Sequence, residues 1–188
     1  QNIKITVMYK EVVLHAKKII KPAYCLIISF GCMPFTNIIA QSPEIQWQNT
    51  IGGNKEDVIN SCKQTPDGGF IIGATSRSDS SGDKSENNMG LSATTDYWIV
   101  KIDNAGNVQW ENTIGGNKDD ELYDVIPTAD GGYLAAGFSY SGIGGDKTEA
   151  RIGPPAYADY WVIKLDADGE IVWQNTIGGG FDDELYCV

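Results

Sequence analysis

Carboxylates are the side chains of this chain with the clearest capacity for chemistry. Asp57, Asp120 and Asp183 recur at one constant spacing, each within a short acidic run. Oxygen-rich loops of this kind could ligate Ca²⁺. In the alternative interpretation, each Asp begins a strand and accepts hydrogen bonds from backbone amides, which caps the preceding connection. An aspartate that is constant at every recurrence favours this structural role.

Two long connections hold the remaining candidates for a binding site. They contain Gly82-Asp83-Lys84-Ser85-Glu86 and Gly145-Asp146-Lys147-Thr148-Glu149. Loops of this length are either ordered parts of the structure or binding loops. In the second case Asp83 and Asp146 would hold Ca²⁺ or a glycan, and Tyr140 and Tyr157 could stack on a sugar. No other cofactor is predicted.

The residues required for common catalytic mechanisms are missing from most of the chain. His15 is the only histidine, so residues 16–188 contain no imidazole for a catalytic triad, a histidine–metal site or proton transfer at neutral pH. Asp166-Ala167-Asp168-Gly169 resembles the start of a calcium loop but lacks the later ligands, which favours a hairpin turn. We therefore predict no catalytic residue.

These residues recur because the sequence repeats itself with a period of 63 residues. Residues 47–109 align on 110–172 without a gap and give 27 identities in 63 positions, and a third copy begins at 173. A tandem repeat of this length is typical of stacked supersecondary units. The residues that we assign to the structure of the repeat are Trp47, Trp110 and Trp173; Asp57, Asp120 and Asp183; Gly68 and Gly131; Asp96 and Trp98; and Asp159 and Trp161.

Each copy shows four strand signals and no sustained helical period. In the first copy they are 45–51, 57–64, 70–75 and 97–102. Asp67-Gly68-Gly69 and Asp130-Gly131-Gly132 are typical of hairpin turns, in which glycine supplies a positive φ. The fourth strand is apolar on both faces, so both faces of its sheet should be covered. We predict an all-β fold of four-stranded antiparallel blades, stacked as an incomplete β-propeller over 41–188.

The first 40 residues are typical of a cleavable export signal. Lys17, Lys18 and Lys21 precede an apolar run that starts at Ala23 and reaches Ala40, where we expect cleavage. A membrane anchor and a lipoprotein signal ending at Cys32 are the alternatives. Removal of this leader would leave Cys62 and Cys187, whose positions in the repeat point to opposite strand faces and make a disulfide between them unlikely.

The charge distribution argues against some partners. The chain has 14 basic and 25 acidic residues; five basic and one acidic lie in 1–40, which leaves 9 against 24 and a net charge of −15 in the rest. Nucleic-acid binding requires clustered Lys and Arg, so we expect no nucleic-acid partner, and no anionic membrane partner once the leader is removed.

The combined motifs resemble repeats of large secreted proteins of the type IX secretion pathway. The motifs are Trp-x-x-x-Ile-Gly-Gly, Asp-Gly-Gly-Tyr/Phe, Gly-Asp-Lys-Ser/Thr-Glu and Asp-Tyr-Trp, and the resemblance covers 44–188. It implies a cleavable signal, propeller-like repeats and a C-terminal sorting domain. The last of these is not visible in this sequence.

Together these features predict an exported protein, either secreted or on the outer cell surface. We expect a non-enzymatic scaffold for binding, adhesion or display, with a glycan or protein ligand on its loops. Two alternatives stay open. The chain could be the N-terminal part of an extracellular carbohydrate-active enzyme whose catalytic residues lie downstream, or a structural spacer.

Overall fold

A computed structural model describes residues 3–8, 11–12, 44–90 and 93–188. No helix occurs among these residues, so the predicted all-β class is confirmed. The described part of the chain therefore also contains no helix able to cross a membrane. The predicted export signal at 17–40, including the cleavage position at Ala40, lies outside the described residues.

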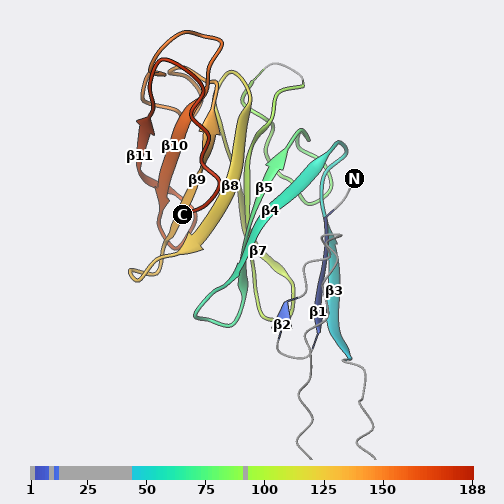
Figure 1. Cartoon of the computed structure of the whole chain (residues 1–188). Helices are drawn as coiled ribbons and strands as arrows, with labels where there is room; N and C mark the ends of the chain where they lie inside the picture. The colour runs from blue at the N-terminus through green and yellow to red at the C-terminus, as the bar shows by residue number, and fades with distance from the viewer. Residues whose placement is uncertain (1–2, 9–10, 13–43, 91–92) are drawn as a thin grey trace, which may run out of the picture. The chain divides into compact units, whose positions relative to one another are not determined.

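The chain divides into two units, Thr6–Gln48 and the remainder. A three-stranded sheet has the order β2-β1-β3 and is formed by β1 (Ile3–Met8), β2 (Glu11–Val12) and β3 (Ile45–Ile51). The larger unit, which contains Asn49–Val188, holds two four-stranded antiparallel sheets (Figure 1).

The two antiparallel sheets have the same strand order. The first sheet consists of β4 (Asp57–Gln64), β5 (Phe70–Ser76), β6 (Asp96–Ile102) and β7 (Val108–Ile114). The second consists of β8 (Asp120–Pro127), β9 (Tyr133–Ser139), β10 (Asp159–Leu165) and β11 (Ile171–Ile177). The fourth strand of each sheet, β7 or β11, comes from the following sequence copy and contains its first tryptophan. The five-residue turn after β6 or β10 brings this strand back antiparallel to the strand before it.

The hairpin turns follow from glycine and from aspartate side chains. Gly68 and Gly131 have φ values of 84° and 89°, a region that L side chains rarely adopt. Asp166 Oδ1 accepts hydrogen bonds from the backbone N–H groups of Asp168 and Glu170 at 3.0 and 2.9 Å. The segment that resembled a calcium loop is thus the hairpin turn between β10 and β11.

The core lies between the two sheets, where β8 packs on β4, β5 and β6. Trp161 is fully buried there, and its ring centroid lies 5.2 Å from that of Tyr97 on β6. Trp98 is also fully buried, whereas Trp110 is partly buried and packs on Tyr133. Trp173, which recurs 63 residues after Trp110, is exposed.

The two sheets differ in how well their faces are covered. Every residue of β6 is buried, as we expected for a strand that is apolar on both sides. In β10 the residues alternate between buried and half-buried, so one face of the second sheet is open. The expectation that both faces are covered is confirmed for the first sheet and wrong for the second. No described sheet packs on that open face as the second sheet packs on the first.

Candidate functional site

The recurring aspartates at the strand starts serve the fold. Asp57 Oδ2 accepts hydrogen bonds from Gly53 N and from the Ser78 hydroxyl, at 2.8 and 3.2 Å. Asp120 Oδ2 accepts the corresponding bonds from Gly116 N and the Ser141 hydroxyl, at 2.7 and 2.9 Å. These bonds tie each strand start to the preceding turn. Asp183 repeats the first of the two bonds, from Gly179 N at 2.6 Å.

Asp96 and Asp159, which precede Tyr-Trp, hold neighbouring loops. Asp96 Oδ2 accepts from Met89 N at 2.6 Å, and Asp159 Oδ2 accepts from Ile152 N at 2.7 Å. Burial raises the pKa of Asp96 to about 7 and also raises that of Asp159. In the described structure the Oδ1 atoms of Asp96, Asp120 and Asp159 are buried and have no hydrogen-bond partner.

The repeated Gly-Asp-Lys-Ser/Thr-Glu motif folds back over the outer strand of each sheet. Asp146 N donates to Gly115 O at 2.9 Å, and Gly115 N donates back to Asp146 Oδ2 at 3.1 Å. Asp83 and Gly52 exchange the same two hydrogen bonds. Glu86 accepts from Thr113 N at 2.8 Å, which satisfies an amide at the edge of β7. The calcium candidates Asp83 and Asp146 are therefore already bonded to backbone amides.

The lysine of this motif is buried in both sheets. Lys84 Nζ donates to Glu86 O at 2.8 Å, and Lys147 Nζ lies 4.8 Å from the centroid of the Trp161 ring. Burial lowers the pKa of both ammonium groups, to about 8 for Lys147. Within the described structure, Lys84 Nζ bonds only within its own loop, to Glu86 O and Asn88 Oδ1, whereas Lys147 Nζ also donates to Thr176 on β11 and so holds its loop on the sheet.

The described residues offer little support for a metal site. They contain no group of three or more His, Cys, Asp or Glu side chains that could hold a metal ion. A groove of about 390 Å³ between β7 and the second sheet is lined by carboxylates. Two of these, Glu111 and Glu86, already accept hydrogen bonds from Trp98 and from backbone amides. The tyrosines proposed for sugar stacking also have aromatic partners: Tyr140 packs on Phe138, and Tyr157 packs on Phe181.

The buried carboxyls predict an unusual pH dependence of stability. The pKa of Asp96 is raised to about 7 and that of Asp120 to about 6, in both cases chiefly by burial, so the folded chain binds protons more tightly than the unfolded chain. The free energy of unfolding should therefore rise as the pH falls from about 8 to about 5. Below about pH 4 it should fall again, because the hydrogen bond from Lys101 lowers the pKa of Asp67 to about 2.

Urea unfolding at pH 8, 5 and 3 measures this dependence. Asp96→Asn is the matched variant, because it removes one raised pKa and should flatten the change between pH 8 and 5. Equal stabilities of the unchanged chain at pH 8 and 5 would contradict the prediction.

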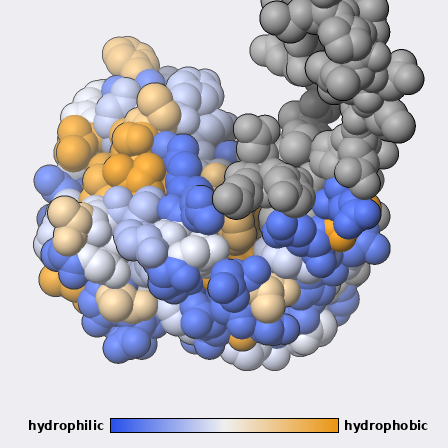
Figure 2. All heavy atoms as spheres, turned by 90° about the horizontal axis from the view of Figure 1, so that it is seen from below, coloured by the Kyte–Doolittle hydropathy of each residue, from blue (hydrophilic) through white to orange (hydrophobic). Residues whose placement is uncertain are grey.

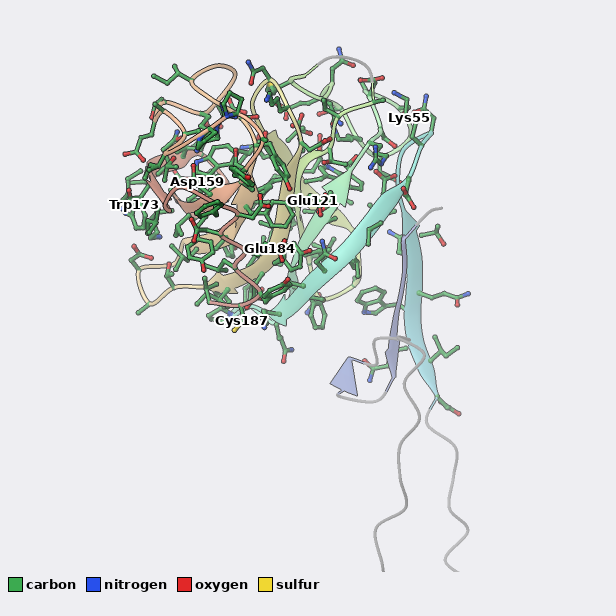
Figure 3. All side chains as sticks on the ribbon, turned by 45° about the horizontal axis from the view of Figure 1, so that its top comes forward. Lys55, Glu121, Asp159, Trp173, Glu184 and Cys187 are labelled. Atoms are coloured by element: carbon green, nitrogen blue, oxygen red, sulfur yellow. The ribbon has the colours of Figure 1, made fainter. Side chains whose placement is uncertain are left out.

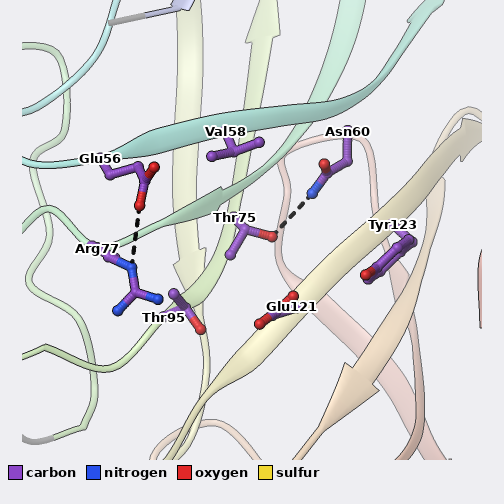
Figure 4. A pocket seen from close by; sticks show the side chains of 8 residues that line it. All are labelled: Glu56, Val58, Asn60, Thr75, Arg77, Thr95, Glu121 and Tyr123. Carbon is purple, nitrogen blue, oxygen red and sulfur yellow. Dashed lines mark hydrogen bonds and ion pairs between the residues drawn. The ribbon is translucent and has the colours of Figure 1, made fainter. Parts of the chain in front are cut away.

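A polar pocket lies where β4 and β5 of the first sheet meet β8 of the second sheet (Figure 4). Its volume is about 170 Å³, and segments beside these strands complete its lining. Its lining residues are Glu56, Val58, Asn60, Thr75, Arg77, Thr95, Glu121 and Tyr123. A few convergent polar groups that could orient a ligand are one feature of small-ligand sites. The sequence predicted ligands on the loops and not in this pocket.

The groups in the pocket are held by hydrogen bonds from both sheets. Arg77 Nε lies 3.5 Å from Glu56 Oε2, and Arg77 Nη1 donates to Ala93 O at 2.9 Å. Asn60 Nδ2 donates to Thr75 Oγ1 at 3.1 Å and to Leu122 O at 2.5 Å. Asn60 thereby joins β4 to β8 across the pocket, which fixes the spacing of the two strands.

The carboxyl of Glu121 gives the pocket its electrostatic character. Burial and the nearby Asp119 raise its pKa, and Arg77 opposes this shift. Tyr123 stands on the same strand, and its ring packs at 5.4 Å on Phe138. The arrangement offers a rigid aromatic ring beside a carboxyl, an amide and a guanidinium, which are groups that accept from and donate to hydroxyls.

The positions that build the pocket differ between the two sheets. Asn60, Thr75 and Arg77 are replaced 63 residues later by Tyr123, Phe138 and Tyr140, which form an aromatic cluster with Tyr186. The hydrogen-bonding aspartates and serines, in contrast, are identical in the two sheets. The fold therefore does not require the pocket residues, and only a comparison of the copies for differences would have found them.

The two cysteines among the described residues are free. Cys62 is half-buried, and burial raises the pKa of its thiol to about 11, whereas Cys187 is exposed. The high pKa of Cys62 makes it a poor nucleophile.

The chain matches no family model and no curated protein.

Proposed function

We propose that this chain is an exported, non-enzymatic binding scaffold of β-propeller type, which presents the pocket between β4, β5 and β8 to a glycan at the cell surface. One observation carries the ligand site: at three positions that line the pocket, Asn60, Thr75 and Arg77, the polar side chain of the first sheet is replaced in the second sheet by an aromatic residue. The architecture is supported by two four-stranded antiparallel sheets that pack face to face. Export is inferred from the sequence of residues 17–40.

A glycan fits the chemistry of the pocket better than a charged ligand. Among the described residues that line the pocket, Arg77 is the only cation, and it lies close to Glu56. The carboxyl of Glu121 accepts hydrogen bonds from hydroxyls. Sugar hydroxyls are both donors and acceptors, as this set of groups requires. Tyr123 supplies an apolar ring face beside them.

Binding to a glycan array, followed by titration calorimetry on the strongest ligand, tests the proposal. Glu121→Gln and Arg77→Gln should each weaken binding about tenfold, because each removes a charged hydrogen-bonding group. Glu170→Gln is the matched control, since this carboxylate lies in the separate acidic groove and should leave binding unchanged. Equal binding by all four chains would refute the pocket as the ligand site.

The hydrolase alternative is favoured by one observation, the presence of Glu56 and Glu121 in a single pocket. Paired carboxyl groups are the usual catalytic set of glycosidases. Incubation of the bound glycan with the protein separates the two functions. New reducing ends that are lost with Glu121→Gln would identify an enzyme, whereas an unchanged glycan supports a binding scaffold.

Export is tested separately by the mass of the surface-exposed protein, which should begin at Gln41.

A further inference from the structure

The second sheet exposes an apolar face whose counterpart in the first sheet is buried. Figure 2 shows apolar residues gathered on the side of the unit where the second sheet lies. Ile177 is 48% exposed, whereas Ile114, at the same position in the first sheet, is 1% exposed. Trp173 on β11 is also exposed at the outer edge (Figure 3). The half-buried residues of this open face on β9 and β10 are Leu134, Tyr160, Val162 and Lys164.

The counterpart face of the first sheet shows what a partner must provide. Tyr97 stacks on Trp161 and donates its hydroxyl proton to the carbonyl of Trp161 at 3.1 Å. A Cβ on Gly137 would lie 1.9 Å from Glu121 O of the neighbouring strand and 2.8 Å from the Tyr97 hydroxyl, so glycine here serves both the pairing of β9 with β8 and the close approach of Tyr97. Tyr160 has the position of Tyr97 in the second sheet and requires the same glycine and carbonyl.

The C-terminal segment Asp183–Val188 already makes contacts that β8 makes on the first sheet. Asp183 N donates to Ala158 O at 2.9 Å, as Asp120 N donates to Thr95 O at 2.7 Å. The residues before each aspartate match as well: Asp182 Oδ1 accepts from Ala158 N at 2.9 Å, and Asp119 Oδ1 accepts from Thr95 N at 3.0 Å. The segment also repeats the sequence Asp-Glu-Leu-Tyr that begins β8.

A second copy of this chain lacks the complementary face. The face that covers Tyr97 carries Trp161, Ile163 and Leu165, and all three are fully buried. The residues of the first sheet at the same positions, Trp98, Val100 and Ile102, are at most 1% exposed. A second copy would thus have to unfold part of itself before it could cover the open face.

We infer that the open face is a docking surface for a further four-stranded antiparallel sheet of the same sequence type, with Asp183–Val188 as its first strand. Its second strand must carry glycine opposite Tyr160. Its third strand must carry tryptophan, whose backbone carbonyl accepts a hydrogen bond from the Tyr160 hydroxyl. The contact is continuous with the interface between the first two sheets. It does not depend on the ligand of the pocket, so glycan binding can fail while this inference holds.

An extended chain tests this docking. A copy of residues 126–177 is appended after Val188, which completes a third sheet around Asp183–Val188. The thiol introduced by Ile177→Cys reports on the open face through its rate of maleimide labelling, located by mass spectrometry. Labelling should be at least about tenfold slower in the extended chain than in the chain that ends at Val188. Binding of the dye ANS should fall as well.

The matched control is the extended chain that carries Tyr160→Lys. This charged side chain changes the open face and leaves the strand pairing of the appended sheet intact, so it should prevent docking and labelling should stay fast. Equal labelling rates in all three chains would overturn the inference. So would a discrete dimer of the chain that ends at Val188, seen by sedimentation, in which the thiol is protected, because a second copy would then be the occupant.

Discussion

Trp161→Ala is expected to cost about 3–5 kcal/mol of unfolding free energy, enough to leave the larger unit marginally folded. The indole is fully buried between the sheets, where it stacks on Tyr97 and donates from Nε1 to Gln174 at 3.1 Å. Its removal leaves a cavity and also deprives the buried Lys147 ammonium of the ring beneath it. Urea unfolding followed by circular dichroism measures the change.

Trp173→Ala is the control for this prediction. The residue type is the same and lies in the same sheet, but Trp173 is 49% exposed on the open face. The loss should be about 1 kcal/mol or less, as for most exposed substitutions. Similar losses for both variants would show that the core is not where the burial of these tryptophans places it.

The parts of the fold that the sequence predicted are those determined by local chemistry. Gly68 and Gly131 supply the positive φ of a turn independently of the residues packed around them. An aspartate at a strand start, such as Asp57, can reach only nearby backbone amides. Repetition strengthened both predictions, because the same pattern recurred in each copy. The hairpins could therefore be found without coordinates, whereas the grouping of strands could not: each sheet takes its fourth strand from the following sequence copy, and β3 pairs with β1 instead of β4.

The pocket could not be predicted in the same way. Asn60 and Leu122 lie 62 residues apart and meet only because the two sheets pack face to face. Which residues form the open face is also not visible locally, since Tyr97 and Tyr160 have the same local sequence but different burial. The buried lysines were missed for a related reason: a charged side chain in a long polar loop is normally solvated, and only the return of the loop over the sheet, as Lys147 lies over Trp161, buries it.

Gly73→Ala is expected to destabilise the chain by about 1–3 kcal/mol, although only one methyl group is added. Gly73 lies on the face of β5 that meets the second sheet, where a Cβ would stand 2.3 Å from Leu122 Cδ2 and 2.9 Å from Val125 Cγ1. Interiors are packed too densely to absorb such an overlap, so the two sheets must separate slightly or side chains must leave their preferred rotamers. Urea midpoints at constant slope measure the loss.

A double-mutant cycle with Leu122→Ala identifies the origin of that loss. Leu122→Ala alone should cost about 2–5 kcal/mol, because Leu122 is fully buried between the sheets. In the double variant the added methyl occupies space that the leucine vacated, so the combined loss should fall short of the sum by about 1 kcal/mol or more. Gly142→Ala is the control, since a Cβ there meets no atom within 4 Å. Strict additivity of the two core substitutions would place the strain of Gly73→Ala within β5 itself rather than at the interface between the sheets.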